Sequence, residues 1–119
     1  SFVLLVDSEF NLLDKKLFDS SVVCTVVDAV LTSENELLVL GNYNSDISIS
    51  GLQIRAKGES DLFLALFKGV GNKVDTKKLL GFGGRFDEIA SALAIDSDKI
   101  FICSISFNIK KFRNMIIFF

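Results

Sequence analysis

An internal repeat constrains this chain more than any single residue does. Three segments of the first half recur in the second: FVLLV at 2–6 as FLALF at 63–67, KKL at 15–17 and again at 77–79, and LTS at 31–33 as IDS at 95–97. A period of about sixty residues is typical of one supersecondary unit copied along a chain, each copy burying its faces against its neighbours. The repeat therefore predicts architecture rather than chemistry.

Composition places the chain among globular proteins. Half of its 119 residues are apolar, and the formal charge of −2 is close to balanced. This length fits a single domain with its own core, so we assign 1–119 to one β-repeat domain. The basic cluster KKFR at 110–113 is too short to indicate a nucleic-acid partner, and none is predicted.

The two cysteines indicate neither a disulfide framework nor a metal cage. Cys24 and Cys103 occupy non-equivalent places in the two copies, and we expect both to be small buried thiols. The segment 2–6 lacks a basic leader and is interrupted by Asp7, so no signal peptide is predicted. No apolar run approaches the roughly 20 residues of a transmembrane helix, so no transmembrane segment is predicted either.

Short runs of Val, Ile, Leu and Phe, separated by Asp, Asn, Ser and Gly, predict an all-β chain. Turns are expected at 7–11, 33–35, 68–73 and 97–99. Only 86–93 has helix-forming Glu and Ala, and its β-branched counterpart at 22–31 favours strand there too. The expected strands are 2–6, 13–18, 26–32, 36–43, 62–67, 74–80, 89–95, 100–107 and, as a final buried strand, 115–119.

Three motifs of the second copy carry a family resemblance: DLFLALF at 61–67, LGFGG at 80–84 and ALAIDSD at 92–98. They resemble the bacterial β-propeller repeat family, whose units read D-x-F-V-A-K, then F-G-G, then I-A-V-D-S-D-G-N-I-Y-V-T-G. The first copy fits more loosely, with AVLTSENELLVLG at 29–41 in place of the hairpin. FDS at 18–20 replaces the glycine pair, and no glycine follows Asp98, which marks a diverged member.

The resemblance implies β-propeller-like, four-stranded antiparallel blades, roughly two of them, in an incomplete propeller. Residues 1–18 would supply the outer strands of one blade, 26–80 a complete blade, and 88–119 a partial blade. Propellers close with about four to eight blades. The chain would therefore be a fragment completed by other blades of a longer protein, would associate as a homo-oligomer, or would form the alternative fold, an open two-sheet β-sandwich.

Catalytic residues are not predicted. The chain has no histidine, which removes the commonest general base and imidazole metal ligation. The acidic pairs Asp7 with Glu9 and Asp96 with Asp98 are expected to be solvated turns, and 96–98 lacks the spaced ligands of a calcium loop. GFGG at 81–84 is expected to be a tight turn between blades rather than a phosphate loop. No cofactor and no metal are predicted.

Surface loops supply the candidate binding residues. Arg85, Phe86 and Asp87 follow GFGG directly and would lie on a propeller rim, on the same face as a long polar loop at 44–60 that carries Arg55 and Lys57. Loops held on a rigid β scaffold are where binding usually resides.

The first functional hypothesis is a non-enzymatic binding or scaffold module with a protein or glycan partner. The alternative is a fragment of a propeller enzyme, such as a glycan-acting hydrolase or lyase, and a third is a structural surface repeat without a ligand. Carboxylates converging on a central channel would favour the enzyme, whereas apolar and small residues there would favour the other two. The resemblance is compatible with an extracytoplasmic location.

Overall fold

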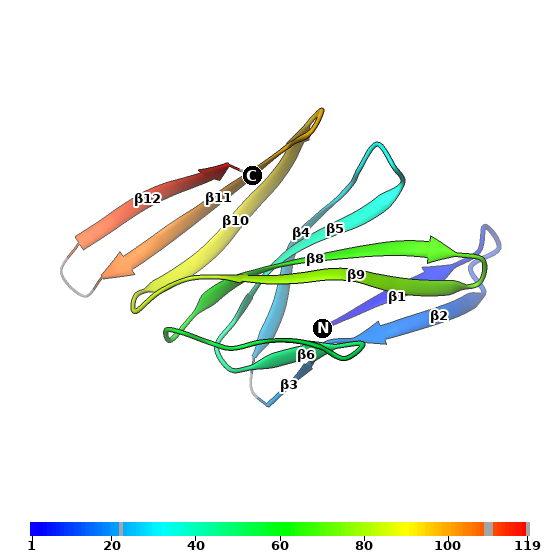
Figure 1. The fold of residues 1–119 in the computed structure, drawn as a ribbon, viewed down its shortest axis with the longest axis horizontal. Helices are drawn as coiled ribbons and strands as arrows, with labels where there is room; N and C mark the ends of the chain where they lie inside the picture. The colour runs from blue at the N-terminus through cyan, green and yellow to red at the C-terminus, as the bar shows by residue number, and fades with distance from the viewer. Residues whose placement is uncertain (22, 109–110, 119) are drawn as a thin grey trace.

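The computed structural model describes the backbone of residues 1–21, 23–108 and 111–118 and the side chains up to residue 106. In these residues the chain is all-β, with antiparallel strands arranged in four sheets (Figure 1). The strands are β1 (Phe2–Val6), β2 (Leu12–Leu17), β3 (Asp19–Ser20), β4 (Cys24–Leu31), β5 (Glu36–Tyr43), β6 (Ile47–Ile49), β7 (Leu52–Ile54), β8 (Asp61–Val70), β9 (Lys73–Phe82), β10 (Asp87–Asp96), β11 (Lys99–Asn108) and β12 (Lys111–Phe118).

The central sheet has the order β4-β5-β8-β9, so the four segments expected to form one four-stranded unit do pair in that order. Strands β5 and β8 lie in the middle, and each contains a continuous apolar run, 37–40 in β5 and 62–67 in β8. Side chains alternate between the two faces of a strand. A continuous apolar run therefore indicates a sheet that is covered on both faces.

One face of the central sheet presents Val39, Phe63, Ala65 and Phe67 to the first core cluster. The β1–β2 hairpin covers part of this face, and the small sheet β3-β6-β7 covers another part. Phe18 packs between them, with its ring centroid 5.0 Å from that of Phe63. The covering residues are Val3 and Leu5 from β1, and Ile47, Ile49 and Ile54 from β6 and β7.

The opposite face carries Leu38, Leu40, Leu62 and Leu64, which form the second core cluster. The sheet β10-β11-β12 covers this face through Ala90, Leu93 and Ile102. The three larger layers are therefore stacked in chain order, with the central sheet between the β1–β2 hairpin and the β10–β12 sheet (Figure 1).

The repeat recurs in the pairing register. Hairpins β1–β2 and β8–β9 each contain a bulge, which skips Leu13 in β2 and Lys77 in β9. Strands β4 and β10 each contain a bulge as well, at Val27 in β4 and at Ser91 in β10. Aligning these bulges makes Phe2↔Leu17 equivalent to Phe63↔Gly81. The two KKL tripeptides are therefore not structurally equivalent. The LTS and IDS segments are equivalent, because Leu31↔Leu37 in the first copy corresponds to Ile95↔Ile100 in the second.

The segment 44–60 was expected to be a polar loop, and that expectation is wrong. It contains the β6–β7 hairpin, whose two-residue turn is Ser50-Gly51, both with positive φ. Ile47 and Ile49 alternate with Ser48 and point into the first core cluster. These two strands have only three residues each and polar neighbours, so the sequence pattern did not indicate them. Their conformation depends on the burial of Ile47 and Ile49 in the tertiary structure.

Other boundaries differ in detail. The turn expected at 68–73 is only Gly71-Asn72, because β8 and β9 extend up to it; Gly71 has φ 58°, as a tight hairpin turn requires. The β10–β11 turn is the residue pair Ser97-Asp98, which fixes the register of the second hairpin. Residues 87–93 lie in strand β10, as the repeat favoured. The final strand, expected at 115–119, begins earlier, at Lys111, and is described as far as Phe118; residue 119 and the burial expected for this strand lie outside the described residues.

The cysteines are less buried than expected. Cys103 is exposed and Cys24 is half-buried, with burial raising the pKa of the Cys24 thiol. Cys103 lies next to the buried Ile102, and alternation along β11 turns its thiol to the opposite, open face.

Candidate functional site

Two segments that precede strands β8 and β10 lie against each other. The segment 55–60 precedes β8, and the segment 83–86 joins β9 to β10. Their backbones touch at Gly58: a Cβ there would collide with the carbonyl oxygens of Gly84 and Phe86. Glycine at position 58 is what allows this approach. We call the two segments together the rim.

The predicted rim residues differ in exposure. Arg55, Lys57 and Arg85 are exposed, whereas Phe86 and Asp87 are half-buried. The guanidinium carbon of Arg85 lies 5.0 Å from the centroid of the Phe86 ring, a cation–π contact. The structure thus brings the 57–58 segment against the 84–86 segment, and it leaves three cationic side chains open to solvent.

Asp61 lies beneath the rim and is fully buried. Its Oδ2 accepts hydrogen bonds from the backbone N–H groups of Lys57 and Gly58, which fixes the first loop. Its Oδ1 has no hydrogen-bond donor among the described residues and lies against Gly83, where a Cβ would collide with it. The second loop therefore packs on this carboxylate.

Glu88 is the second buried carboxyl of the rim, only 5% exposed. Its Oε2 lies 3.4 Å from the backbone N of Gly84, which donates to it. Burial raises the pKa of the Glu88 carboxyl, and the carboxyls of Asp61 and Asp87 raise this pKa further against the opposing effect of the Gly84 N–H. The raised pKa of Glu88 favours its protonated, neutral form, which lowers the charge buried beside Asp61.

Asn42 connects the central sheet to the next one. Its Nδ2 donates to the carbonyl oxygens of Glu88 at 2.8 Å and Asp61 at 3.3 Å, and its Oδ1 accepts from the N–H of Ala90 at 3.0 Å. Ser60 completes this link: its carbonyl oxygen accepts from the N–H of Glu88 at 2.9 Å, and its Oγ donates to the Glu88 carbonyl oxygen at 3.0 Å. These hydrogen bonds therefore hold the two sheets together at the base of the rim.

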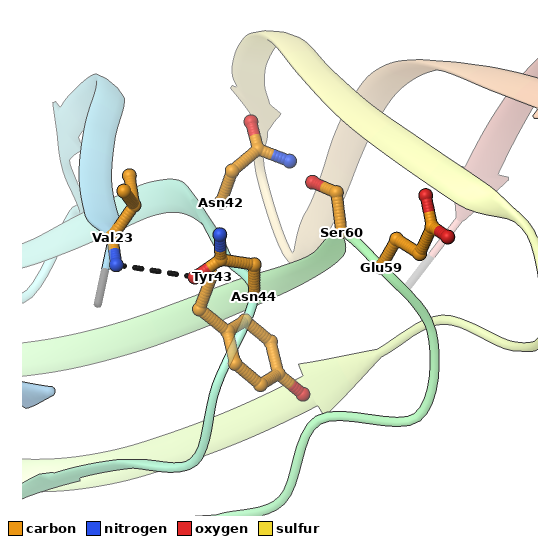
Figure 2. Close-up of a pocket in the computed structure, with 6 residues that line it drawn as sticks. All are labelled: Val23, Asn42, Tyr43, Asn44, Glu59 and Ser60. Atoms are coloured by element: carbon orange, nitrogen blue, oxygen red, sulfur yellow. Dashed lines mark hydrogen bonds between the residues drawn. The ribbon is translucent and has the colours of Figure 1, made fainter. Parts of the chain in front are cut away.

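A small pocket of about 90 Å³ opens beside this link, lined by Val23, Asn42, Tyr43, Asn44, Glu59 and Ser60. In Figure 2, Asn42 and Ser60 face each other across it, while the ring of Tyr43 points away. The Tyr43 hydroxyl donates to the Arg55 carbonyl oxygen at 3.1 Å, and burial raises the pKa of Tyr43 to about 12. Ligand pockets usually have roughly 300 Å³ or more, so this one is too small for a sugar ring.

A larger cleft lies between the central sheet and the β10–β12 sheet, at the strand ends that are far from the rim. It has a volume of about 360 Å³ and adjoins a second hollow of about 250 Å³, with which it shares Thr32, Glu36 and Ile100. The larger part is lined mainly by leucines: Leu38, Leu64, Leu66 and Leu80. It is a gap between diverging sheets rather than a site with converging polar groups.

The other acidic pairs are local turns. Oδ1 of Asp7 accepts from the N–H groups of Glu9 and Asn11 at 2.9 Å, and the Asn11 side chain, the largest influence, lowers the pKa of Asp7. Asp98 pairs with its neighbour Lys99 at 3.2 Å. Within the described residues there is no group of three or more Cys, Asp or Glu side chains that could hold a metal ion.

Sequence reasoning missed Asp61, Glu88, Asn42 and Ser60. Asp61 did carry a signal, since it is a charged residue at the head of the apolar run DLFLALF. Nothing in the local sequence indicated that Asp61 and Glu88 meet, because they come from strands of different sheets.

Comparison with protein-family models, with curated proteins and with solved structures gave no match. Among the described residues, no helix has the length and apolar character needed to cross a membrane.

Proposed function

We propose that this chain is a non-enzymatic β-propeller-repeat module that binds an acidic partner, a protein or a glycan, at the rim. The observation that carries the proposal is the rim itself. Two loops from successive sheets are joined at Gly58 and held from below by Asp61, Glu88 and Asn42. Above this fixed base, Arg55, Lys57 and Arg85 are exposed.

The propeller part of the proposal is supported by the stacking of the sheets. Four antiparallel strands in chain order form the central sheet, and partial sheets cover its two faces. The bulges repeat at equivalent positions, which is what copies of one blade would show. A two-sheet sandwich would bury one face of each sheet, whereas here the central sheet is buried on both.

The non-enzymatic part is supported by the strands that would line a propeller channel, β4 and β10. Their exposed side chains are mainly small or apolar, among them Val26, Val27, Ala92 and Ala94. The best acidic pair, Asp61 with Glu88, is buried beneath the rim, where a substrate cannot reach it. These observations favour binding over the alternative of a glycan-acting enzyme fragment.

Binding can be tested by biolayer interferometry with two immobilised probes, polygalacturonate and poly-glutamate. We expect the 119-residue chain to bind one of them, and the double variant Arg55→Glu/Arg85→Glu to lose about tenfold or more of the affinity, as loss of two partly desolvated charge contacts would cause. The matched control is Lys15→Glu/Lys73→Glu, which makes the same change in net charge on exposed residues of β2 and β9 away from the rim. Absence of binding to both probes, or equal loss in the control, would contradict the proposal.

A further inference from the structure

We propose that the cleft between the central sheet and the β10–β12 sheet binds the anion of a medium-chain fatty acid, with the alkyl chain along the leucines and the carboxylate at Lys78. The volume of the cleft, about 360 Å³, lies within the range of roughly 300–1,000 Å³ that ligand pockets usually have. The proposal does not depend on binding at the rim.

The cleft exists because the two sheets are linked near the rim and diverge from there (Figure 1). The Asn42 side chain bonds to the backbone of Glu88, and the Asp28 side chain bonds to the backbone of Leu93. The cleft lies beyond these links, where Ile100 of β11 lines it opposite the central sheet. Divergence of the sheets thus leaves part of the apolar face of the central sheet incompletely covered.

Strand register makes the wall of the cleft apolar. Leu38 of β5 pairs with Leu66 of β8, and Leu64 of β8 pairs with Leu80 of β9. Side chains of directly paired residues lie on the same face of a sheet, so three neighbouring strands together form one leucine surface. Leu80, on the outermost of these strands, is 46% exposed. Covering this surface with an alkyl chain removes apolar area from water, which is favourable.

Charged residues follow the leucines toward one end of the cleft. Glu36 precedes Leu38 by two positions and Lys78 precedes Leu80 by two, so alternation places both on the face of the leucines, on the side of the β8–β9 turn. The surface is therefore apolar along most of its length and charged at one end. A ligand that matches this pattern is a single alkyl chain with one charged head group.

The available charge at that end is positive. Glu36 is already compensated by Lys68, whose Nζ lies 3.9 Å from its Oε1. Lys78 is exposed and lies opposite Leu66, and none of the ion pairs between described residues includes it. Lys78 is thus the cation that is free to pair with a ligand. This charge fits the carboxylate of a fatty acid rather than an ammonium head group.

The adjoining hollow limits the length of the chain. Past Ile100 the lining changes from leucines to polar side chains, with Ser33, Glu34, Ser97 and Asp98 around the hollow of about 250 Å³. An alkyl chain that extended into this hollow would gain little apolar contact there. We therefore expect affinity to rise with chain length only while the added methylenes still contact leucines, which favours a medium chain such as laurate over palmitate.

Isothermal titration calorimetry of the 119-residue chain with laurate below its micellar concentration tests the proposal. We expect one laurate per chain and an affinity about tenfold or more lower in Lys78→Glu, because a partly desolvated charge contact becomes a repulsion. The same variant should bind dodecyltrimethylammonium more tightly than the wild type does. Lys73→Glu is the matched control, since it makes the same change of net charge at an exposed residue of β9 outside the cleft.

Two further comparisons test the position and length of the alkyl chain. Leu80→Glu should also lower laurate affinity about tenfold or more, since it removes apolar contact and adds a like charge. Its control is Leu12→Glu, at a leucine of β2 that is 60% exposed and distant from the cleft, which should leave the affinity unchanged. Octanoate should bind more weakly than laurate, and palmitate should bind no more tightly than laurate.

Other results would overturn the proposal. Absence of laurate binding to the wild type would mean that the cleft takes no fatty acid. Equal losses in Lys78→Glu and Lys73→Glu would mean attraction by net charge, and uptake of many laurate molecules without saturation would mean detergent-like adsorption. Unchanged affinity in Leu80→Glu would place the ligand elsewhere. Circular dichroism checks folding, and Lys78→Gln replaces Lys78→Glu if that variant is not folded.

Discussion

The Nδ2 of Asn42 donates a hydrogen bond to the carbonyl oxygen of Glu88 at 2.8 Å, joining the middle of the central sheet to the first strand of the next one. Both polar side-chain atoms of Asn42, Nδ2 and Oδ1, form hydrogen bonds with backbone groups. The Asn42 amide, with Ser60 and Asp28, thereby supplies hydrogen bonds between two sheets whose strands do not pair with each other.

We expect Asn42→Ala to lower the free energy of unfolding by about 2–4 kcal/mol, because it leaves the Ala90 N–H and the Glu88 carbonyl oxygen with fewer partners in a partly buried place. Urea denaturation followed by circular dichroism measures this. Asn11→Ala, at the exposed β1–β2 turn, should cost under about 1 kcal/mol. Equal losses in the two variants would show that Asn42 has no special role between the sheets.

The pH dependence of stability should report the buried carboxyl of Glu88. The folded-state pKa of Glu88 is raised above its ordinary value of 4.5, so the folded state binds this proton more tightly than the unfolded state does. Its contribution to stability is therefore complete below pH 4.5 and is lost as the pH rises through the folded-state pKa.

Because Gln cannot lose a proton, we expect Glu88→Gln to remove the loss of stability that accompanies rising pH. At neutral pH this variant should be more stable than the wild type by roughly 1 kcal/mol. Thermal unfolding at several pH values between 4 and 8 measures the difference. Exposed Glu9→Gln is the control, and its pH profile should parallel that of the wild type. A Glu88→Gln profile parallel to the wild type would show that the folded-state pKa of Glu88 is not raised.

The close approach of the rim loops predicts that Gly58→Ala is destabilising. A Cβ at this position collides with backbone oxygens of Gly84 and Phe86, which cannot rotate away as side chains can. We expect a loss of about 2 kcal/mol or more, as for other overpacked sites. Gly69→Ala is the matched control, because a Cβ there meets nothing within 4 Å. If both substitutions are neutral, the two loops are not in contact.

Asp28 in β4 makes a second link between the central sheet and the β10–β12 sheet, separate from the link at Asn42. Its Oδ2 accepts from the N–H of Leu93 at 2.9 Å, and its Oδ1 accepts from the N–H of Ala29 at 2.8 Å. Asp14 makes the same pair of bonds, to Val74 at 2.7 Å and Lys15 at 2.9 Å. Both aspartates directly follow a bulged residue, so each bulge turns a carboxylate toward the neighbouring sheet.

We expect Asp28→Ala to cost about 1–3 kcal/mol, since it removes hydrogen bonds to a charged acceptor and leaves the N–H of Leu93 without that partner. Hydrogen exchange should show faster exchange of the Leu93 amide in this variant. The control Asp96→Ala removes only a 3.5 Å contact with Ser97 at an exposed turn. An unchanged exchange rate at Leu93 would contradict the role of Asp28.

The strands could be predicted because their signal is local. Segments such as 2–6 and 36–43 alternate or run continuously in apolar residues between turn-forming residues, and their bounds agree with β1 and β5. The β6–β7 hairpin could not be predicted, because Ile47 and Ile49 become strand residues only through burial against the central sheet. A three-residue strand has too few residues to show a period.

The candidate site divides in the same way. Arg55, Lys57, Arg85, Phe86 and Asp87 could be named from the sequence, because loop residues next to glycines and strand ends are recognisable there. Their contacts at Gly58 and the acid pair beneath them were decided by packing, which brings together strands of two sheets. The sequence by itself determined the all-β class and most strands, since side-chain period and turn chemistry are local. Only the tertiary structure decided the stacking order of the sheets and the burial of Asp61 and Glu88 beneath the rim, because these depend on which sheets meet.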